Sequence, residues 1–344
     1  MTAGLPEADS PAEVPQTTAT TESPNSSKSP RLWLQVAKVF GWLVLLGLAI
    51  PATLRILWVE VGPSAVIVSF IPWITMITVV FTVVLLIARW WPHAATGIVL
   101  SIIGLSWLVP LYIAAPDPPA QRRVNVGTVN TLFGHANPDE IVAMVRDHDL
   151  DVLSVQELTG VELARLNTAG LTRLLPYSRA LPAEGAAGTG LWSRTPLTKV
   201  STPDTTQFAV VEATTTTRTG VTMRVVAAHP AAPDLLHTGP WRRDAAALYE
   251  VMQNALSDQG VVVLAGDLNA TLDHPPIRRL EGLGLVDAVT AAGAGFHPTY
   301  PNDGELIPLV AIDHVMARGL VARSADVVSI DRSDHKALVT SMVG

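Results

Sequence analysis

The sequence predicts a mixed α/β domain preceded by three membrane-spanning helices. Two observations carry this prediction. Long apolar runs are confined to residues 31–114, and after about residue 121 short strand-like runs alternate with helical segments. The composition agrees, since 49% of the residues are hydrophobic and only 15% are charged, an apolar balance for which the long runs account.

The chain begins with a polar segment, residues 1–30, which is rich in Pro, Ser, Thr, Ala and Glu and is predicted to be a disordered tail. Three apolar runs follow at about 33–54, 65–88 and 94–114. Each meets the requirement of roughly 20 residues for crossing the hydrocarbon core of a bilayer. The alternative of three buried core helices is disfavoured, because core helices of soluble proteins rarely run this long without a charge. Residues 31–114 are therefore predicted to be a multi-pass membrane anchor.

Three spans put the two ends of the chain on opposite sides of the membrane. Lys28, Arg31 and Lys38 flank the first span, and Arg89 lies in the loop between the second and third. Because Lys and Arg concentrate in cytoplasmic loops, this pattern favours a cytoplasmic N-terminus, although two arginines just after the anchor weigh against it. We expect a protein of the cell membrane whose C-terminal domain is extracytoplasmic.

The C-terminal domain is predicted to occupy residues 121–344, after a Pro-rich linker at 115–120. Strands are expected at 123–130, 151–157, 188–193, 207–215, 221–228, 261–265, 310–317, 325–330 and 336–342, and helices at 137–148, 160–169 and 241–256. The first helix has a clear start, with Asn137 as its cap, Pro138 at the first position and two acids in the first turn.

Polar side chains gather at or near the ends of the predicted strands. The run Val261-Val262-Val263-Leu264-Ala265 predicts a strand buried on both faces, which Gly266 ends at a sharp turn before Asp267 and Asn269. The other members of the set are Asn130, Glu157, His229, Asp313, Asp334 and His335. Strand ends on one edge of an α/β domain can converge into a crevice, so we expect these side chains to form one site.

The residue types in this set define the chemistry that the site supports. Carboxylate and carboxamide oxygens suit Mg²⁺, Mn²⁺ or Ca²⁺, and imidazoles add acid–base groups. The chain has no cysteine, no His-x-x-x-His and no Gly-x-Ser-x-Gly, so it lacks disulfide-linked partners and the usual parts of zinc proteases and serine hydrolases. Each member alone also fits an ordinary role, such as a turn pair for Asp267 and Asn269 or a structural histidine for His229. Their joint occurrence favours a catalytic site.

The order and flanks of these residues resemble the endonuclease/exonuclease/phosphatase superfamily, which includes deoxyribonuclease I. The matching pieces are Asn-Val-Gly-Thr-Val-Asn130, Val-Gln-Glu157, Gly190-Leu-Trp-Ser-Arg194, the strand that ends in His229, Gly-Asp267-Leu-Asn269, Ile-Asp313-His-Val and Ser-Asp334-His335. Each piece alone is weak, but all occur in family order across the C-terminal domain. The resemblance implies a two-sheet, four-layer α/β sandwich with the site at one edge, and metal-dependent hydrolysis of a phosphoester or pyrophosphate bond.

The resemblance also implies a set of metal ligands. Glu157 would be the principal ligand of Mg²⁺ or Mn²⁺, with Asn130 beside it and Asp334 joining them. His314 follows a catalytic-type residue, Asp313, but is expected to point to the other face of its strand, because successive side chains alternate.

Five further residues would act on the substrate, according to the same resemblance. Asp267 would orient or deprotonate the attacking water, and Asn269 would bind a phosphoryl oxygen. His335 would be the general base or a hydrogen-bond donor in the transition state, and Asp313 would hold it in one tautomer. His229 would donate to the phosphoryl group or to the leaving oxygen.

The sequence defines the substrate less closely than the reaction. The C-terminal domain holds 18 Lys and Arg against 24 Asp and Glu, so a basic footprint for nucleic acid is not expected. An anchor keeps the site near lipid-borne substrates, and three spans before such a domain are similar to bacterial membrane proteins of the VanJ type. This architectural resemblance implies removal of phosphate from a lipid carrier. Two alternatives stay open, a membrane-tethered nuclease and a catalytically silent binding module.

Overall fold

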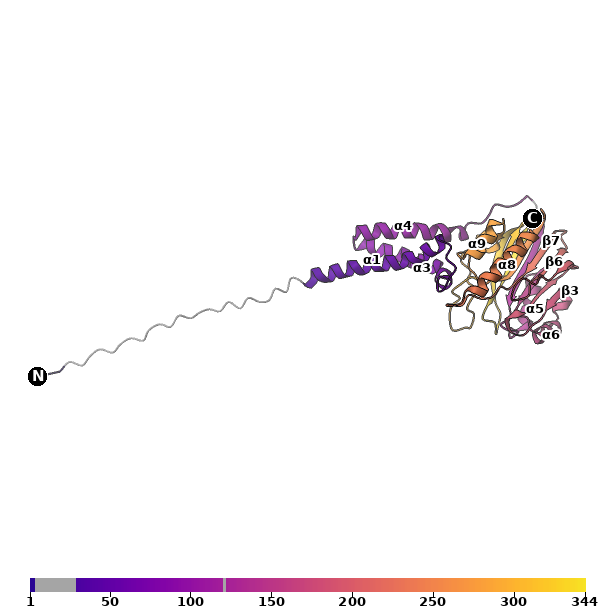
Figure 1. The fold of residues 1–344 in the computed structure, drawn as a ribbon, viewed down its shortest axis with the longest axis horizontal. Coiled ribbons are helices and arrows are strands. Elements are labelled where there is room, and N and C mark those ends of the chain that lie inside the picture. Colours follow the sequence, from indigo (N-terminus) through magenta and orange to yellow (C-terminus); the bar gives the residue numbers. More distant parts are fainter. Residues whose placement is uncertain (4–28, 120–121) are drawn as a thin grey trace. The chain divides into compact units, whose positions relative to one another are not determined.

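The computed structural model describes residues 1–3, 29–119 and 122–344 (Figure 1). Most of the predicted disordered tail and the last residue of the predicted linker lie outside these ranges. The chain divides into two compact units, Met1–Leu43 and Val44–Gly344.

The helices of residues 31–114, the region predicted to be an anchor, differ in part from the three predicted spans. Its elements are α1 Ser29–Ile56, α2 Ser64–Ser69, α3 Ile71–Ile87, α4 Trp91–Leu108 and the 3-10 helix η1 Val109–Tyr112. Among the described residues, two stretches, 31–56 and 91–112, are long and apolar enough to cross a membrane. The first and third predicted spans therefore meet this criterion, and the second does not.

The second predicted span, 65–88, is interrupted at Phe70. This residue has φ −95° and ψ 9°, outside the helical region, and separates α2 from α3. Pro72 in the first turn of α3 has no N–H with which to continue the hydrogen bonds of α2. α3 keeps 17 residues, or about 26 Å at 1.5 Å per residue, which is somewhat less than the roughly 30 Å of a hydrocarbon core.

α3 and α4 pack through small and hydroxyl-bearing residues. A Cβ added to Gly97 would lie 2.4 Å from Thr82 Oγ1, and one added to Gly104 would lie 2.4 Å from Thr75 Oγ1. Thr82 Oγ1 also lies 3.3 Å from Ser101 Oγ. The two helices therefore approach closely, as is typical of helix pairs inside membranes.

Two six-stranded sheets form the C-terminal domain within residues 122–344 (Figure 1). Their strand orders are β11-β12-β1-β2-β4-β3 and β5-β6-β7-β8-β10-β9. The strands are β1 Arg123–Asn130, β2 Val152–Gln156, β3 Tyr177–Leu181, β4 Thr189–Ser193, β5 Thr198–Ser201, β6 Val211–Thr216, β7 Thr222–Ala227, β8 Val261–Asp267, β9 Val286–Asp287, β10 Asp313–Arg318, β11 Val321–Ser329 and β12 Lys336–Val343. β1 pairs with β2 and β7 with β8 in parallel, and the other ladders are antiparallel.

Three apolar cores lie between the layers of the domain. One core lies between the sheets and includes Val126, Val225 and Val315. A second packs α8 and α9 on the second sheet, and a third packs α5, α6 and α7 on the first. The helices are α5 Pro138–Asp147, α6 Gly160–Ala169, α7 Leu171–Leu174, η2 Gly185–Ala187, α8 Gly239–Ala255, α9 Pro275–Gly282 and α10 Ala288–Ala292. This arrangement confirms the predicted four-layer sandwich of two sheets with helices outside.

Most predicted elements are present, with shifts of a few residues at their ends. β1 and α6 have the predicted bounds, and Asn137 caps α5 by accepting a hydrogen bond from Asp139 N at 3.2 Å. The strands that the sequence did not reveal are β3, β5 and β9, each at the edge of a sheet. Edge strands are less buried, so their apolar pattern is weak; β5 is exposed along its whole length.

Gly266 lies inside β8 rather than at a turn, which corrects the expectation from the sequence. β8 continues through Asp267, which pairs with Asp313 of β10. A Cβ at Gly266 would lie 1.9 Å from the carbonyl oxygen of Ala228. Glycine is required there because the chain that leaves β7 passes very close to β8.

Replacing Gly266 by Ala is expected to lower the free energy of unfolding by roughly 1–3 kcal/mol, because the new methyl group must displace backbone atoms. Gly282→Ala is the matched control, since a Cβ at Gly282 meets nothing within 4 Å. Chemical denaturation of the two variants checks this expectation. Equal stabilities would contradict it.

Candidate active site

Strand ends from both sheets meet at one edge of the sandwich. Asn130 is the last residue of β1 and pairs with the last residue of its parallel neighbour β2. In the other sheet, Asp267 at the end of β8 pairs with Asp313 at the start of β10. The sheets are joined beneath by Ser154 Oγ, which donates to the Ala265 carbonyl at 3.0 Å. This packing brings polar groups from distant parts of the sequence together.

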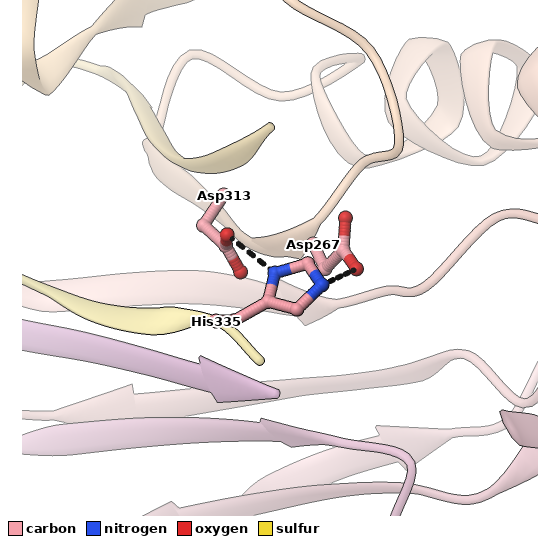
Figure 2. A group of neighbouring side chains, drawn as sticks. All are labelled: Asp267, Asp313 and His335. Atoms are coloured by element: carbon pink, nitrogen blue, oxygen red, sulfur yellow. Dashed lines mark hydrogen bonds and ion pairs between the residues drawn. The ribbon is translucent and has the colours of Figure 1, made fainter. Parts of the chain in front are cut away.

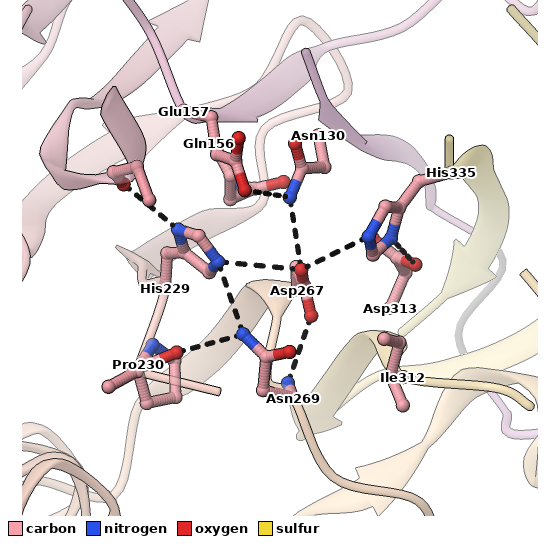
Figure 3. Close-up of polar contacts among 12 residues, drawn as sticks. Asn130, Gln156, Glu157, His229, Pro230, Asp267, Asn269, Ile312, Asp313 and His335 are labelled. Carbon is pink, nitrogen blue, oxygen red and sulfur yellow. Dashed lines mark hydrogen bonds and ion pairs between the residues drawn. The ribbon is translucent and has the colours of Figure 1, made fainter. Parts of the chain in front are cut away.

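Asp267 lies at the centre of the polar cluster (Figure 3). Its Oδ2 accepts a hydrogen bond from Asn130 Nδ2 at 3.0 Å and lies 3.4 Å from His229 Nε2. The same oxygen lies 3.7 Å from His335 Nε2, whereas Oδ1 accepts from Asn269 N at 2.9 Å. Burial alone would raise the pKa of Asp267, but the charge of His335 and the hydrogen bond from His229 lower it well below its usual range. Asp267 is therefore a buried carboxylate that stays ionised.

Asp313 and His335 form a carboxylate–imidazole pair (Figure 2). Both side chains are buried, and His335 Nδ1 donates to Asp313 Oδ2 at 2.9 Å. Burial lowers the pKa of His335, but the carboxylates of Asp313 and Asp267 raise it to about 10. The ring is therefore protonated near neutral pH, with its Nε2 directed at Asp267. Asp313 thus lies where it can hold His335 in one orientation, and the catalytic roles of both residues stay predictions.

His229 approaches Asp267 from another side (Figure 3). Its Nδ1 lies 3.2 Å from the Ala186 carbonyl, which leaves Nε2 directed at the carboxylate. Burial lowers the pKa of His229, but the hydrogen bond and charge of Asp267 raise it above its usual value. Asn269 Nδ2 donates to the Pro230 carbonyl at 3.0 Å and lies 3.2 Å from His229 Nε2. The loop after β7 and the loop after β8 thus hold one another in place.

Glu157 directly follows β2. Its backbone has φ 55°, in the left-handed region that residues other than glycine rarely adopt. Its Oε2 accepts from Phe133 N at 2.8 Å, and its Oε1 accepts from Asn130 Nδ2 at 3.1 Å. The oxygen of the Asn130 side chain accepts from Leu132 N at 2.9 Å. Asn130 therefore directs its NH₂ group at the carboxylates. Its oxygen is engaged elsewhere, which differs from the metal-ligand role that the sequence suggested.

The acidic residues of the cluster crowd one another. Burial raises the pKa of the half-buried Asp334, and the nearby Glu157 and Asp267 raise it further. The charge of His335 offsets only part of this effect. Asp313 Oδ1 is buried and has no hydrogen-bond partner among the described residues. Oxygen donors that repel one another in this way fit a divalent cation, which would relieve the repulsion.

Two further aromatic rings, those of His314 and Tyr300, differ in their relation to the cluster. His314 lies apart from the cluster, as strand alternation predicted, with Nδ1 2.9 Å from Asp287 Oδ2 and Nε2 2.8 Å from the Ala270 carbonyl. The Tyr300 ring, in contrast, packs on the His335 ring with centroids 4.9 Å apart. No sequence pattern marks Tyr300, because it lies in a segment without apolar periodicity.

His274 makes the stability of the protein depend on pH. Its Nδ1 accepts from Thr271 N at 2.9 Å, its Nε2 lies 2.7 Å from the Ala65 carbonyl, and complete burial lowers its pKa from 6.5 to about 4. The unfolded chain therefore takes up a proton at about pH 6.5, whereas the folded chain does so only near pH 4. The resulting stability is fully present above pH 6.5 and is lost as the pH falls toward 4.

We expect the melting temperature to fall less between pH 7 and pH 5 in His274→Gln than in the unchanged chain, because glutamine does not titrate. Thermal unfolding followed by circular dichroism at both pH values measures the difference. The same fall in both proteins would show that His274 contributes nothing to the pH dependence.

A two-sheet α/β sandwich with carboxylate, amide and imidazole groups at its strand ends defines a class of phosphoester hydrolases. The sequence model of the Endonuclease/Exonuclease/phosphatase family matches residues 127–335, more than half of the chain, so the chain belongs to that family. It is accordingly an enzyme that hydrolyses phosphoester bonds. No match to a curated protein sequence was found.

Solved structures of low sequence identity share the fold. The endonuclease/exonuclease/phosphatase from Beutenbergia cavernae DSM 12333 is 19% identical with a TM-score of 0.50, over 65% of this chain and 72% of that chain. The protein of the same description from Bacteroides vulgatus is 17% identical with a TM-score of 0.51, over 64% and 98%. TDP2 from D. rerio, complexed with a single strand DNA product, is 16% identical with a TM-score of 0.50, over 64% and 98%. At these identities the comparison supports the fold of residues 122–344.

Proposed function

We propose that the protein is a membrane-anchored, divalent-metal-dependent phosphoesterase that acts on a lipid-linked phosphate at the outer face of the membrane. The observation that carries the proposal is where the anchor contacts the domain. Arg55 at the end of α1 pairs with Asp273 at 2.6 Å, and Trp73 Nε1 of α3 donates to the Leu309 carbonyl at 2.7 Å. Asp273 lies four positions after Asn269, and Leu309 lies four positions before Asp313. We infer from these two contacts that the active-site edge lies near the anchor, which suits a substrate held in the bilayer.

The distribution of charge along the chain supports a lipid-linked phosphate as the substrate. The domain is acidic, which disfavours binding of long polyanions such as nucleic acid. A single phosphate group could still be bound by the imidazoles of His229 and His335. The cations beside the first span favour a cytoplasmic N-terminus and so an extracytoplasmic domain. The bilayer and a phosphorylated lipid are thus the proposed partners.

The side chains of the cluster would supply the proton and anion chemistry of hydrolysis. Asp267, which stays ionised, would orient the attacking water and accept its proton. His335, held by Asp313, would donate from Nε2 to the phosphoryl group as negative charge develops, and His229 would donate to the leaving oxygen. Asn269 would bind a phosphoryl oxygen.

Glu157 and Asp334 are the residues that would hold the metal, Mg²⁺ or Mn²⁺. A bound divalent cation would supply Lewis-acid stabilisation of charge on the phosphoryl oxygens. Asn130 would position the carboxylates of Glu157 and Asp267 through its NH₂ group, which contacts both.

Nuclease activity is the second candidate. One observation favours it, namely that the similar fold of D. rerio TDP2 was solved with a single strand DNA product. The excess of acidic residues in this domain opposes it. Both candidates use the same cluster, so an assay of two substrates separates them.

Full-length protein in lipid nanodiscs with Mg²⁺ or Mn²⁺ is expected to release phosphate from a polyprenyl pyrophosphate without nicking plasmid DNA. Glu157→Ala is expected to lower this turnover by roughly 10²-fold or more, because metal ions contribute several kcal/mol to transition-state stabilisation. Glu250→Ala, at an exposed position of α8, is the control and is expected to keep full activity. Nicking alone would favour the nuclease, and neither activity in a folded protein would favour a silent binding module.

A further inference from the structure

Two pairs of large apolar side chains are exposed on loops that border the site. Leu235 and Leu236, between β7 and α8, are 55% and 80% exposed. Leu306 and Ile307, between Tyr300 and β10, are 58% and 66% exposed. The first loop continues the chain after His229, and the second separates Tyr300 from Asp313. We call them the Leu235–Leu236 loop and the Leu306–Ile307 loop.

Both loops are attached to the ends of the anchor helices. Thr238 Oγ1, at the end of the Leu235–Leu236 loop, donates to the Glu60 carbonyl at 3.1 Å, and Glu60 lies between α1 and α2. Trp73 Nε1, near the start of α3, donates to the Leu309 carbonyl at the end of the Leu306–Ile307 loop at 2.7 Å. The exposed pairs are therefore held close to the point where the apolar helices end.

Aromatic residues mark the same end of the anchor. The Arg278 guanidinium lies 3.9 Å from the ring centre of Trp58, just after α1, and the Arg55 guanidinium lies 4.0 Å from that of Trp107 in α4. Trp73 belongs to the same group, and tryptophans are enriched where membrane helices meet water. An exposed leucine by itself needs no explanation, but two pairs beside such a belt form a surface that suits the interior of a bilayer.

The local conformation of the Leu306–Ile307 loop suits insertion. Asp303 Oδ1 accepts hydrogen bonds from Glu305 N at 3.0 Å and from Leu306 N at 3.1 Å. This turn fixes the backbone before the apolar pair without help from the rest of the domain. The acids of the turn favour contact through apolar burial and oppose attraction to anionic lipids.

We propose that the Leu235–Leu236 and Leu306–Ile307 loops insert into the membrane leaflet next to the domain and seat the rim of the active site on the bilayer. The partner of this surface is the lipid bilayer itself. The proposal rests on the membrane anchoring proposed above, and it adds that the domain docks on the membrane instead of standing away from it on a tether. Docking would bring a lipid-borne phosphate to the site with its chain still in the leaflet.

The absence of cysteine from the sequence permits a direct test. Single cysteines replace Leu236, Ile307, Val80 or Val161 in the full chain, and each is labelled with a nitroxide in nanodiscs of phosphatidylcholine. Val80 lies in α3 and is 64% exposed, so it reports the anchor, whereas Val161, 69% exposed on α6, is the matched control. Collision with oxygen measures lipid exposure, and collision with a water-soluble nickel chelate measures water exposure.

The labels at positions 236 and 307 are expected to meet oxygen more than nickel, as at position 80, and the label at position 161 to meet nickel. Adding phosphatidylglycerol should not strengthen insertion. Loop labels that behave like position 161, while position 80 is in lipid, would overturn docking and leave the anchor intact. Water exposure at position 80 would overturn anchoring as well, and the catalytic assay would remain a separate test.

A second test measures the consequence for turnover. The double variant Leu236→Asp, Ile307→Asp is expected to lower hydrolysis of a polyprenyl pyrophosphate in nanodiscs at least 10-fold and to leave hydrolysis of a water-soluble short-chain analogue unchanged. Leu236→Ser with Ile307→Ser is the milder control and should show a smaller loss. Equal activity of the Asp variant and the unchanged chain on the bilayer substrate would contradict docking.

Discussion

Asp267→Asn is expected to lower kcat by roughly 10²–10⁴-fold, the range that a positioned proton acceptor contributes. Asparagine keeps the shape of the side chain and the hydrogen bond from Asn269 N to Oδ1. It places an NH₂ group where Oδ2 accepts from Asn130 Nδ2 and faces the two imidazoles. The new NH₂ group then faces other N–H donors. The variant also loses one of the two carboxylate charges, those of Asp313 and Asp267, that raise the pKa of His335.

Steady-state kinetics of the purified full chain check this expectation against two controls. Asp326→Asn makes the same chemical change at an exposed position of β11 and should keep full activity. A far-UV circular dichroism spectrum equal to that of the unchanged chain shows that Asp267→Asn is folded. More than a tenth of normal kcat in the folded variant would remove Asp267 from the mechanism.

The strand ends that carry the site were predictable, because each follows a local pattern. The apolar run of β8 and the short run of β2 mark buried strands, and a polar residue directly after such a strand stands out in the sequence. Asp267 and Glu157 were found in this way. His229 also follows a predicted strand, but its own signal, one histidine before a proline, is weak, and the family order strengthens it.

The partners of these residues were not predictable from local patterns. Asn130 contacts Asp267 across 137 positions of the chain and across two sheets, and only the packing of the sandwich creates that contact. The direction of the Asn130 amide depends on a hydrogen bond from Leu132 N, in a loop without periodicity. The same limit applies to Gly266. A glycine after an apolar run predicts a turn, but its cause here is the close approach of Ala228, which only the folded chain creates.

The region predicted to be the anchor shows a different limit of prediction from sequence. Mean hydropathy over a window does not detect a helix break, so residues 65–88 read as one apolar run. Pro72 lacks the N–H that a continuous helix requires at this position. The contacts of Arg55 and Trp73 with the domain likewise join residues more than 200 positions apart.

Asp313→Asn is expected to lower kcat by roughly 10²-fold or more with a smaller change in KM. Asp313 is a positioning residue, since it holds His335 through the 2.9 Å bond from Nδ1 and helps to keep the ring protonated. Loss of its charge lowers the pKa of His335, so the ring gives up its proton at lower pH than before. Activity that depends on the protonated ring should then fail at lower pH on the alkaline side of the pH–rate profile.

The matched control for this variant, Asp287, lies in the neighbouring strand β9. His314 Nδ1 and Asp287 Oδ2 form a second buried carboxylate–imidazole pair, also 2.9 Å apart, outside the cluster. Asp287→Asn removes an equivalent buried charge and should lower stability by a comparable amount, roughly 1–3 kcal/mol, while kcat per folded molecule stays unchanged. If the two variants lose kcat equally, the effect of Asp313 is on the domain as a whole. If only Asp313→Asn loses kcat and shifts the alkaline limit of the pH–rate profile, the pair of Asp313 and His335 acts on the reaction itself.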